Sequence, residues 1–376
     1  MPKKILLDLK NLASKPLSHA SAMPKEIYTS DKILDLEDAL IFSKEWICAG
    51  RETEIPNVGD YFTFNIGKQP IIILRGANKK VRAMSNVCLH RMMQIVEGKG
   101  NKKVFTCPYH AWSYDLDGKL VMAKYMDRTE CFNQSKMKLL EIRCEISLGW
   151  IYVTLNPDID SLSKSLVSLN EILSPYKMEH YIDIISEDHI WDTNWKLLTE
   201  NFMEGYHLPV AHQGTVGPYI NLSDTEFDKR GAFDSFTYQT FTKNEDSVVG
   251  TAHPDNKSLT GRWRHTSVLP TVFPSHMYSL APDHLWYLSL QPNGTNKVNI
   301  KFGAAIAPEV LQDQSDPEKF LNETKEFLYN VQKEDRFVVE GIFKGVNAPL
   351  GNPGPLSWLE RENHEFTQYI ARKLVN

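Results

Sequence analysis

The sequence predicts an α+β protein, with a small all-β domain followed by a larger domain of strands and long helices. Residues 46–154 form short β-branched and aromatic runs between turns, which is typical of an all-β domain. From residue 157 onward, helically spaced leucines and a long helical segment flank an aromatic-rich, strand-like middle. A chain of 376 residues with 42% hydrophobic content is long enough for two domains that each bury a core.

Residues 1–44 are predicted to form a polar arm and then a helix, which together pack on the larger domain. Ser30 and Asp31 are placed to cap this helix at its start. Its apolar face is expected to comprise Ile33, Leu34, Leu36, Ala39, Leu40 and Phe42.

The all-β domain is predicted over residues 45–156. Its strands are expected at Trp46–Ala49, Tyr61–Asn65, Ile71–Leu74, Val81–Met84, Val104–Thr106 and Trp150–Thr154. Asp117-Gly118 indicates a tight hairpin turn between Trp112–Tyr114 and Leu120–Met122, because this dipeptide favours the turns that join antiparallel strands.

The larger domain is predicted over residues 157–376, after a boundary at Asn156-Pro157-Asp158. Its expected order is a helix at 161–173, a strand at 181–190, a helix from about Asn194, strands within 214–305, and helices at 316–343 and 360–374. Pro317 suits the first turn of the long helix, where its missing N–H removes no hydrogen bond.

Composition excludes several classes of function. The net charge is −5 without a long basic run, so nucleic-acid binding is not expected. Five cysteines without a disulfide-like pattern favour a reducing cytoplasm. The N-terminus lacks the apolar core of a signal peptide, and no stretch reaches eighteen apolar residues, so we expect a cytoplasmic protein without a membrane span.

Two Cys–His pairs indicate a metal centre in the first domain. Cys88 and His90 form a C-x-H pair, and Cys107 and His110 form a C-x-x-H pair after sixteen intervening residues. Zinc fingers usually place two cysteines in one pair and two histidines in the other. Mixed pairs instead suit a two-iron cluster in which the cysteines bind one iron and the histidines the other. A zinc site is the alternative.

The segment from Asn86 to Gly118 resembles a Rieske [2Fe-2S] domain, in its ligand spacing, in Pro108-Tyr109 and in the Trp112–Gly118 run that follows. The resemblance implies that Cys88, His90, Cys107 and His110 hold the cluster. Arg91 matches the frequent Cys-x-His-Arg of this family. Met92 replaces the glycine that commonly follows, so the first cluster loop is expected to pack differently.

A second metal signature lies within residues 194–212. Glu204 and His207 are three residues apart, so a helix would place them on one face, and Pro209 is expected to end that helix. His212 follows on the next turn or loop. Two imidazoles and a carboxylate suit an iron(II) site with open positions for dioxygen. The alternative is a pair of histidines with a purely structural role.

This stretch resembles the mononuclear-iron motif of Rieske non-haem iron oxygenases, in which N-W-K-x3-E-N leads into acid-x2-H-x4-H. The resemblance implies that His207 and His212 are iron ligands. The family's third ligand is an Asp within an acid–Asp pair on a late helix, which matches Asp335, with Glu334 as the competing neighbour. Asn201 and Tyr206 would line the site. The larger domain would then be a helix-grip-like catalytic domain.

Glu204 departs from the Asp that most family members have at this position. By resemblance, this acid connects a cluster histidine, here His110, to His207 of the adjacent subunit in a homotrimer. A carboxylate that accepts N–H bonds from both rings fixes their tautomers. Glu here is typical of oxygenases of the carnitine, choline and glycine betaine group.

The predicted substrate is therefore a small quaternary ammonium compound such as glycine betaine, carnitine, choline or a proline betaine. Aromatic rings bind such cations through cation–π attraction. The second domain is rich in rings that could form a cage: Phe202, Tyr206, Tyr219, Trp263, Phe273, Tyr278, Trp286 and Tyr287. The alternative is a Rieske dioxygenase or O-demethylase that acts on an aromatic compound in an apolar pocket.

Electrons are expected from a separate flavin and iron–sulfur reductase that uses NAD(P)H, because the chain has no G-x-G-x-x-G dinucleotide fingerprint. A non-enzymatic Rieske ferredoxin is a further alternative. Residues 180–376 and the second iron motif count against it, since a ferredoxin needs the first domain alone.

Overall fold

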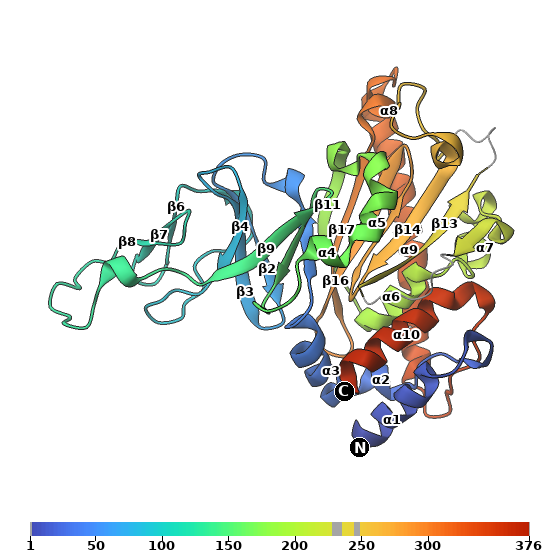
Figure 1. Cartoon of the computed structure of the whole chain (residues 1–376), viewed down its shortest axis with the longest axis horizontal. Coiled ribbons are helices and arrows are strands. Elements are labelled where there is room, and N and C mark those ends of the chain that lie inside the picture. The colour runs from blue at the N-terminus through green and yellow to red at the C-terminus, as the bar shows by residue number, and fades with distance from the viewer. Residues whose placement is uncertain (1, 228–234, 244–248, 376) are drawn as a thin grey trace. The chain divides into compact units, whose positions relative to one another are not determined.

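The computed structural model describes residues 2–227, 235–243 and 249–375, and the chain divides into two compact units (Figure 1). One unit comprises residues 42–162. The other joins residues 1–41 to residues 163–376, so the N-terminal arm belongs with the larger unit. Phe233, which lies in the predicted strand region, is outside the described residues.

The 42–162 unit is all β and contains a seven-stranded and a three-stranded sheet. The larger sheet has the order β1-β10-β9-β4-β3-β2-β5 and the smaller has β6-β7-β8. Their bounds are β1 Ile47–Arg51, β2 Asp60–Ile66, β3 Gln69–Arg75, β4 Val81–Ser85, β5 Lys99–Asn101, β6 Val104–Thr106, β7 Ser113–Asp115, β8 Leu120–Met122, β9 Glu141–Ser147 and β10 Trp150–Thr154.

The hairpin predicted around Asp117-Gly118 joins β7 to β8, which pair antiparallel. Gly118 has a φ of 77°, a left-handed conformation that glycine adopts without a steric cost. The Asp115 carboxylate accepts hydrogen bonds from the backbone N–H groups of Asp117 and Lys119, both at 2.9 Å. This turn connects the last two strands of the small sheet, which follow the second Cys–His pair in the chain.

The larger unit is built on a seven-stranded antiparallel sheet with the order β11-β17-β16-β15-β14-β13-β12. Together with the all-β unit, this sheet and its helices confirm the predicted α+β class. The strands are β11 Ile182–Trp191, β12 Thr225–Phe227, β13 Phe236–Thr242, β14 Thr266–Val272, β15 His276–Leu280, β16 His284–Pro292 and β17 Val298–Ile306.

Helices α6 and α9 pack against this sheet, and α10 packs against α6 and β13. The helices are α1 Pro2–Ala13, α2 Glu26–Thr29, α3 Asp31–Glu37, α4 Leu162–Ser165, α5 Val167–Leu173, α6 Trp195–Met203, α7 Leu208–Ala211, α8 Pro308–Gln312, α9 Pro317–Val346 and α10 Arg361–Leu374. Pro317 occupies the first turn of α9, as predicted. The 30-residue α9 and the sheet it crosses frame the site described below.

The N-terminal arm is tied to α6 by a buried network around the N-W-K sequence. The Asn194 side chain accepts the backbone N–H of Lys196 and so caps α6. Trp195 Nε1 donates to the Glu37 carboxylate at 2.8 Å, and Lys196 Nζ pairs with the same carboxylate at 2.7 Å. Asn194 Nδ2 donates to the carbonyl of Tyr28. The arm therefore fixes the start of the helix that leads into the second histidine pair.

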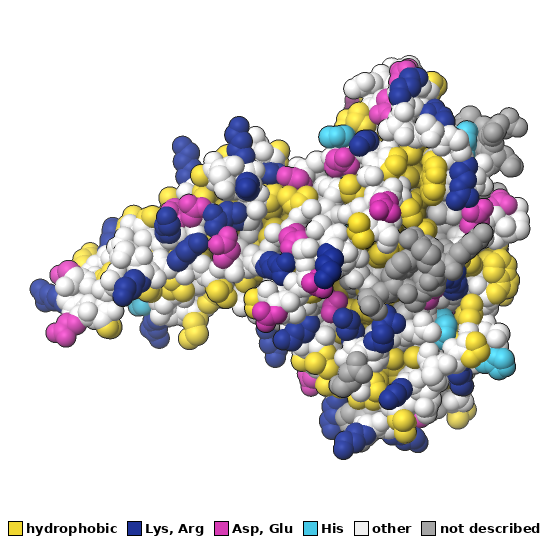
Figure 2. Space-filling model, in the orientation of Figure 1, with side chains coloured by type: hydrophobic (Ala, Val, Ile, Leu, Met, Phe, Trp, Pro, Cys, Tyr) yellow, Lys and Arg dark blue, Asp and Glu magenta, His cyan; other side chains and the backbone are white. Residues whose placement is uncertain are grey.

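On the face shown in Figure 2, basic and acidic side chains are interspersed. Within the described residues, no helix combines the length and hydropathy that crossing a membrane would require.

Candidate functional site

The two Cys–His pairs lie on two loops with the same backbone design. In the first loop, Cys88 N–H donates to the Met93 carbonyl, and in the second, Cys107 N–H donates to the Trp112 carbonyl, both at 2.8 Å. The residue four positions after each cysteine is left-handed, with φ 57° at Met92 and 58° at Ala111. Met92 thus adopts the left-handed conformation that a glycine would favour, and whether its side chain changes the packing of the first loop stays a prediction.

Within these loops, the thiols are buried and the imidazoles are exposed. The His90 and His110 rings lie 4.6 Å apart, and His90 stacks on Trp112 at 4.8 Å. Cys88 Sγ lies 3.3 Å from the Tyr114 hydroxyl. Burial raises the pKa of the Cys107 thiol, so a bound metal is needed to hold it as thiolate.

This donor set fits a two-iron cluster better than a single ion. Among the described residues, the group that brings three ligand atoms within 4.8 Å of one another is His207, His212 and Asp335, and the Cys–His loops form no such group. A single zinc ion would require all four donors at about 2.0–2.3 Å. Two buried sulfurs with two outer imidazoles, spread more widely, match a cluster with separate cysteine-bound and histidine-bound irons.

The second histidine pair meets Asp335 of α9 at a common point. His212 Nε2 lies 3.3 Å from His207 Nε2 and 3.1 Å from Asp335 Oδ1, and His207 Nε2 lies 3.6 Å from the same oxygen. Ligands at about 2.1 Å from an ion and at right angles to each other are about 3 Å apart. This spacing fits a 2-His-1-carboxylate site that leaves further positions open.

Two more carboxylates hold the other ring nitrogens. His207 Nδ1 donates to Glu204 Oε1 at 2.6 Å, and the backbone N–H of His207 donates to Glu204 Oε2 at 3.1 Å. His212 Nδ1 donates to Glu334 Oε2 at 2.8 Å. These contacts place protons on Nδ1 and direct both Nε2 atoms toward Asp335. Asp335 thus faces the Nε2 atoms of both histidines, whereas Glu334 contacts His212 at Nδ1.

The electrostatics of the triad match a cation site. Burial opposes the charge on His207, but its hydrogen bonds to the Asp335 and Glu204 carboxylates outweigh burial and raise its pKa to about 9. The pKa of His212 is also raised despite burial, through the same Asp335 carboxylate. Burial would raise the pKa of Asp335, but the two imidazoles lower it. Without a metal ion, protons on the two imidazoles therefore supply the positive charge that the ion would otherwise provide.

The chain around Glu204 differs from the predicted helix. α6 ends at Met203, and Glu204 is extended, with φ −120°. The prediction that Glu204 and His207 share a helix face is therefore wrong. Pro209 does not end a helix but lies in the first turn of α7. Gly205 has little space for a side chain, because a Cβ at this position would lie 3.3 Å from Phe241 Cζ.

The other predicted site residues differ in placement. Asn201 Nδ2 lies 3.4 Å from His207 Nε2, next to the triad. Tyr206 is 55% exposed, and this exposure does not support a position in a closed site. Thr215, which the sequence did not single out, donates its hydroxyl to Glu334 at 2.5 Å. No local pattern marks Thr215, because its partner is far away on α9.

The predicted aromatic set divides between the two faces of the sheet. Tyr278 pairs with Tyr287, and Ser279 pairs with Trp286, so Trp286 points to the face opposite the two tyrosines. Trp286 packs against Phe202 of α6, with ring centroids 4.9 Å apart. Because α6 leads into the triad, Phe202 and Trp286 are on its side of the sheet and Tyr278 and Tyr287 are not. Phe273 stacks on Tyr369 in the core.

Comparisons with known proteins match both units. Residues 45–133 match the Rieske [2Fe-2S] domain, and residues 176–375 match the ring hydroxylating alpha subunit (catalytic domain). The carnitine monooxygenase oxygenase subunit of Escherichia coli (strain K12) is 33% identical over 207 residues, which cover 54% of this chain and 55% of that protein. The glycine betaine monooxygenase oxygenase subunit of Chromohalobacter salexigens is 34% identical, and the match covers 54% of this chain and 46% of that protein. The match thus spans about half the length of these curated relatives.

Two solved structures share the fold. A quaternary ammonium Rieske monooxygenase, in a structure described for carnitine oxidation and inter-subunit electron transfer, is 23% identical with a TM-score of 0.83, and the match covers 97% of this chain and 98% of that one. Naphthalene 1,2-dioxygenase from Rhodococcus sp. is 20% identical with a TM-score of 0.81, covering 99% and 98%. The catalytic-domain match covers more than half of the chain, and this protein therefore belongs to the ring-hydroxylating oxygenase alpha-subunit family, with a Rieske domain preceding the catalytic domain.

Proposed function

We propose that this chain is the oxygenase component of a monooxygenase that hydroxylates a small quaternary ammonium compound and so removes or cleaves one of its nitrogen substituents. The proposal depends on one observation: the chain has both the Cys–His loops and the triad, and Glu204 is hydrogen-bonded to His207 of the triad. The relatives named for carnitine and glycine betaine support this substrate class.

In this proposal, Cys88, Cys107, His90 and His110 hold a [2Fe-2S] cluster, and His207, His212 and Asp335 hold one iron(II). When bound, the cluster supplies single electrons and the iron supplies the activation of dioxygen. The residues of this chain then have separate tasks. Glu334 keeps His212 in the required tautomer, while Asn201 offers an amide beside the open side of the triad.

The overall reaction balances as substrate plus O2, two electrons and two protons giving hydroxylated substrate plus water. Hydroxylation of a carbon next to nitrogen yields a carbinolamine. This compound collapses to an amine, and a methyl substituent leaves as formaldehyde. The electrons come from NAD(P)H through a separate flavin and iron–sulfur reductase.

Glu204 is proposed to join two copies of the chain. Each of its oxygens already accepts one hydrogen bond from His207, and each has a further lone pair for a histidine of another copy. His110 is exposed and suited to that role. Its loops carry exposed apolar side chains that favour a protein contact: Leu89, Met92, Met93 and Tyr109. The catalytic unit also exposes Phe337, Leu350 and Trp358. We propose a homotrimer assembled through these surfaces.

Phe202 and Trp286 are the proposed aromatic partners of the substrate cation, because they share the triad's side of the sheet. The same two rings could also enclose an aromatic substrate, so oxidation of an aromatic compound is the second candidate. The fold shared with naphthalene 1,2-dioxygenase is compatible with it.

A single-turnover assay tests the proposal. Anaerobically purified, chemically reduced protein is mixed with oxygen and a panel of betaines, carnitine, choline and simple aromatic compounds, and products are identified by mass. A demethylated or cleaved amine from one quaternary compound supports the proposed substrate class. Oxidised aromatics with untouched amines would replace it with the second candidate. Iron content above two per chain distinguishes an oxygenase from a ferredoxin.

A further inference from the structure

The backbone leaves the helical path at the end of α6, and one carbonyl loses its usual partner there. In an α-helix, each carbonyl accepts the N–H of the residue four positions later. The Met203 carbonyl would therefore accept the N–H of His207 if the helix continued. Instead, α6 ends at Met203, and the His207 N–H donates to Glu204 Oε2 at 3.1 Å. The Met203 carbonyl thus needs a donor from elsewhere.

Gln239 of β13 supplies this donor. Its side-chain Nε2 donates to the Met203 carbonyl at 2.6 Å, and the residue is fully buried. Because a carbonyl oxygen only accepts hydrogen bonds, the amide nitrogen must be the atom that faces it. The side chain of Gln239 therefore takes the place that the N–H of His207 would have in a continuous helix.

This exchange of partners determines which acceptor the His207 N–H can bind. The N–H donates to Glu204 Oε2, while Nδ1 of the same histidine donates to Oε1 at 2.6 Å. Two hydrogen bonds to two oxygens fix the direction of a carboxylate as well as its position. If the His207 N–H returned to the Met203 carbonyl, one oxygen of Glu204 would be released. The contact of Gln239 with Met203 is therefore coupled to the contact of His207 with Glu204.

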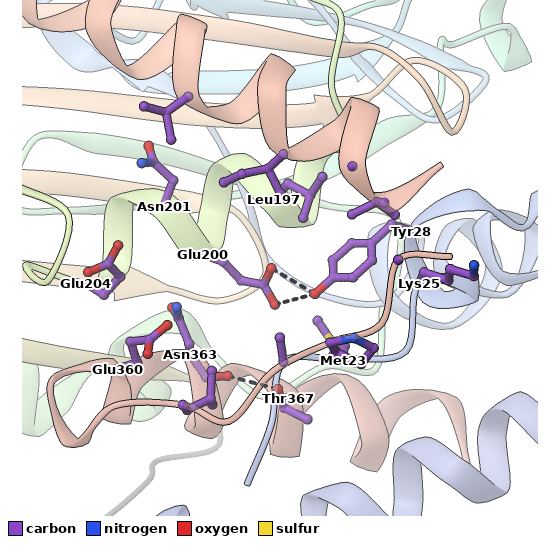
Figure 3. A pocket seen from close by; sticks show the side chains of 18 of the residues that line it. Met23, Lys25, Tyr28, Leu197, Glu200, Asn201, Glu204, Glu360, Asn363 and Thr367 are labelled. Carbon is purple, nitrogen blue, oxygen red and sulfur yellow. Dashed lines mark hydrogen bonds between the residues drawn. The ribbon is translucent and has the colours of Figure 1, made fainter. Parts of the chain in front are cut away.

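The direction of the Glu204 carboxylate matters because Glu204 borders open space. Glu204, Asn201 and His207 line a cavity of about 510 Å³, and Glu204 lies just beyond the last turn of α6 (Figure 3). In the proposed function, a histidine of another copy binds this carboxylate. A carboxylate that is held at both oxygens presents its remaining lone pairs in fixed directions. A residue that maintains this geometry therefore also maintains the acceptor for the second histidine.

Phe241 supports the same segment from the same strand. Residues two apart on a strand point to the same face, so Phe241 lies on the face of β13 from which Gln239 contacts Met203. A Cβ at Gly205 would lie 3.3 Å from Phe241 Cζ. β13 therefore contacts the chain on both sides of Glu204, at Met203 through Gln239 and at Gly205 through Phe241.

We propose that Gln239 is a positioning residue for Glu204. By donating to the Met203 carbonyl, it keeps the His207 N–H available to hold the Glu204 carboxylate. The task of Glu204 rests on the proposed function, but the positioning is a property of a single copy of the chain. Gln239 therefore acts on the triad through Glu204 and not through a contact of its own with a ligand residue.

A double-mutant cycle tests this role, with the iron(II) affinity of the triad as its readout. Iron(II) is titrated into protein that retains its cluster but has been depleted of the third iron. Gln239→Met keeps the length of the side chain and removes the donor. It should weaken iron(II) binding by about 3–10-fold, less than the roughly 10–100-fold expected when a direct partner of a ligand is lost. In a chain that also carries Glu204→Ala, Gln239→Met should have no further effect, because the carboxylate that it positions is absent.

Gln291→Met is the matched control. Gln291 is another buried glutamine of the same sheet, but it lies on the face of β16 opposite the one that carries Trp286. Its replacement should leave the iron(II) affinity unchanged. Gln239→Asn keeps the amide on a shorter side chain and should weaken iron(II) binding less than Gln239→Met does. The same cycle is completed with Gln239→Asn if Gln239→Met does not fold.

The cycle separates this inference from the proposed function. An equal loss of iron(II) affinity with and without Glu204→Ala would mean that Gln239 supports the fold and not Glu204. No loss in either background would mean that the contact with Met203 does not affect the site. Either result would overturn this inference and leave the proposed function standing. If Gln239→Met behaves as expected while Glu204→Ala retains normal turnover in the single-turnover assay, the link between copies fails and the role of Gln239 stands.

Discussion

The two Cys–His loops and the triad represent two ways of building a candidate metal site. The proposed cluster ligands lie within residues 88–110, on two loops whose shape is fixed by hydrogen bonds between near neighbours. The triad joins His207 and His212 to Asp335, which is 123 residues beyond His212. The first site depends on local sequence, and the second depends on how α9 packs beside α6. The comparison predicts that changes at the triad act through partners distant in sequence, whereas changes at the loops remain local.

The largest effect is expected from Asp335→Ala, which removes the distant ligand. The iron content should fall from about three to about two per chain, because the cluster is held elsewhere. Metal analysis and the spectrum of the reduced cluster measure the two sites separately. Glu334→Gln is the matched control, and it should retain the third iron with an affinity about 10–100-fold weaker. If Glu334→Gln lost the iron and Asp335→Ala kept it, the roles of the two acids would be reversed.

Glu204→Gln should separate electron transfer from metal binding. The amide cannot accept both histidine protons in the same way, so turnover should fall by about 10–100-fold while both metals stay bound. Iron content and the rate of cluster reoxidation with substrate and oxygen are the measurements. Glu204→Asp keeps the charge but shortens the side chain, and partial activity in this variant would show that only the length of the side chain matters. Normal turnover in Glu204→Gln would rule out the proposed link between copies.

The buried network that holds the start of α6 lies away from both candidate metal sites, and we expect its removal to lower the stability of the protein. Glu37→Gln leaves Lys196 buried without its counter-ion, which should lower the free energy of unfolding by about 3–5 kcal/mol. Urea denaturation gives this value. The control Asp192→Asn removes an exposed pair with Lys297 at 3.7 Å and should change stability by less than about 1 kcal/mol. Similar losses in both variants would mean that the buried network does not anchor the helix.

What the sequence could predict follows the same division. The spacing of Cys88, His90, Cys107 and His110 predicted the two loops that the structure brings together, because local hydrogen bonds decide their shape. The end of α6 at Met203 was missed, and the close approach of Gly205 to Phe241 just after it joins residues that are distant in sequence.

Two further features also depend on tertiary packing. The partner of Lys196 is Glu37 on the N-terminal arm, and periodicity alone does not connect them. The sheet faces of Tyr278 and Trp286 depend on strand register, which the aromatic composition of the segment does not specify.

The smallest effect is expected within the first cluster loop. Met92 is held at φ 57° and is 81% exposed, so its side chain contributes little packing to offset a left-handed backbone. Met92→Gly should therefore stabilise the protein by up to about 1 kcal/mol, since the steric cost exceeds the entropy that glycine loses. Thermal unfolding of the cluster-loaded protein measures the change. Ala111→Gly should act in the same direction, because Ala111 occupies the equivalent position in the second loop at φ 58°. Destabilisation by both changes would show that the loops hold these residues without strain, and that the bound cluster, rather than the backbone, determines their shape.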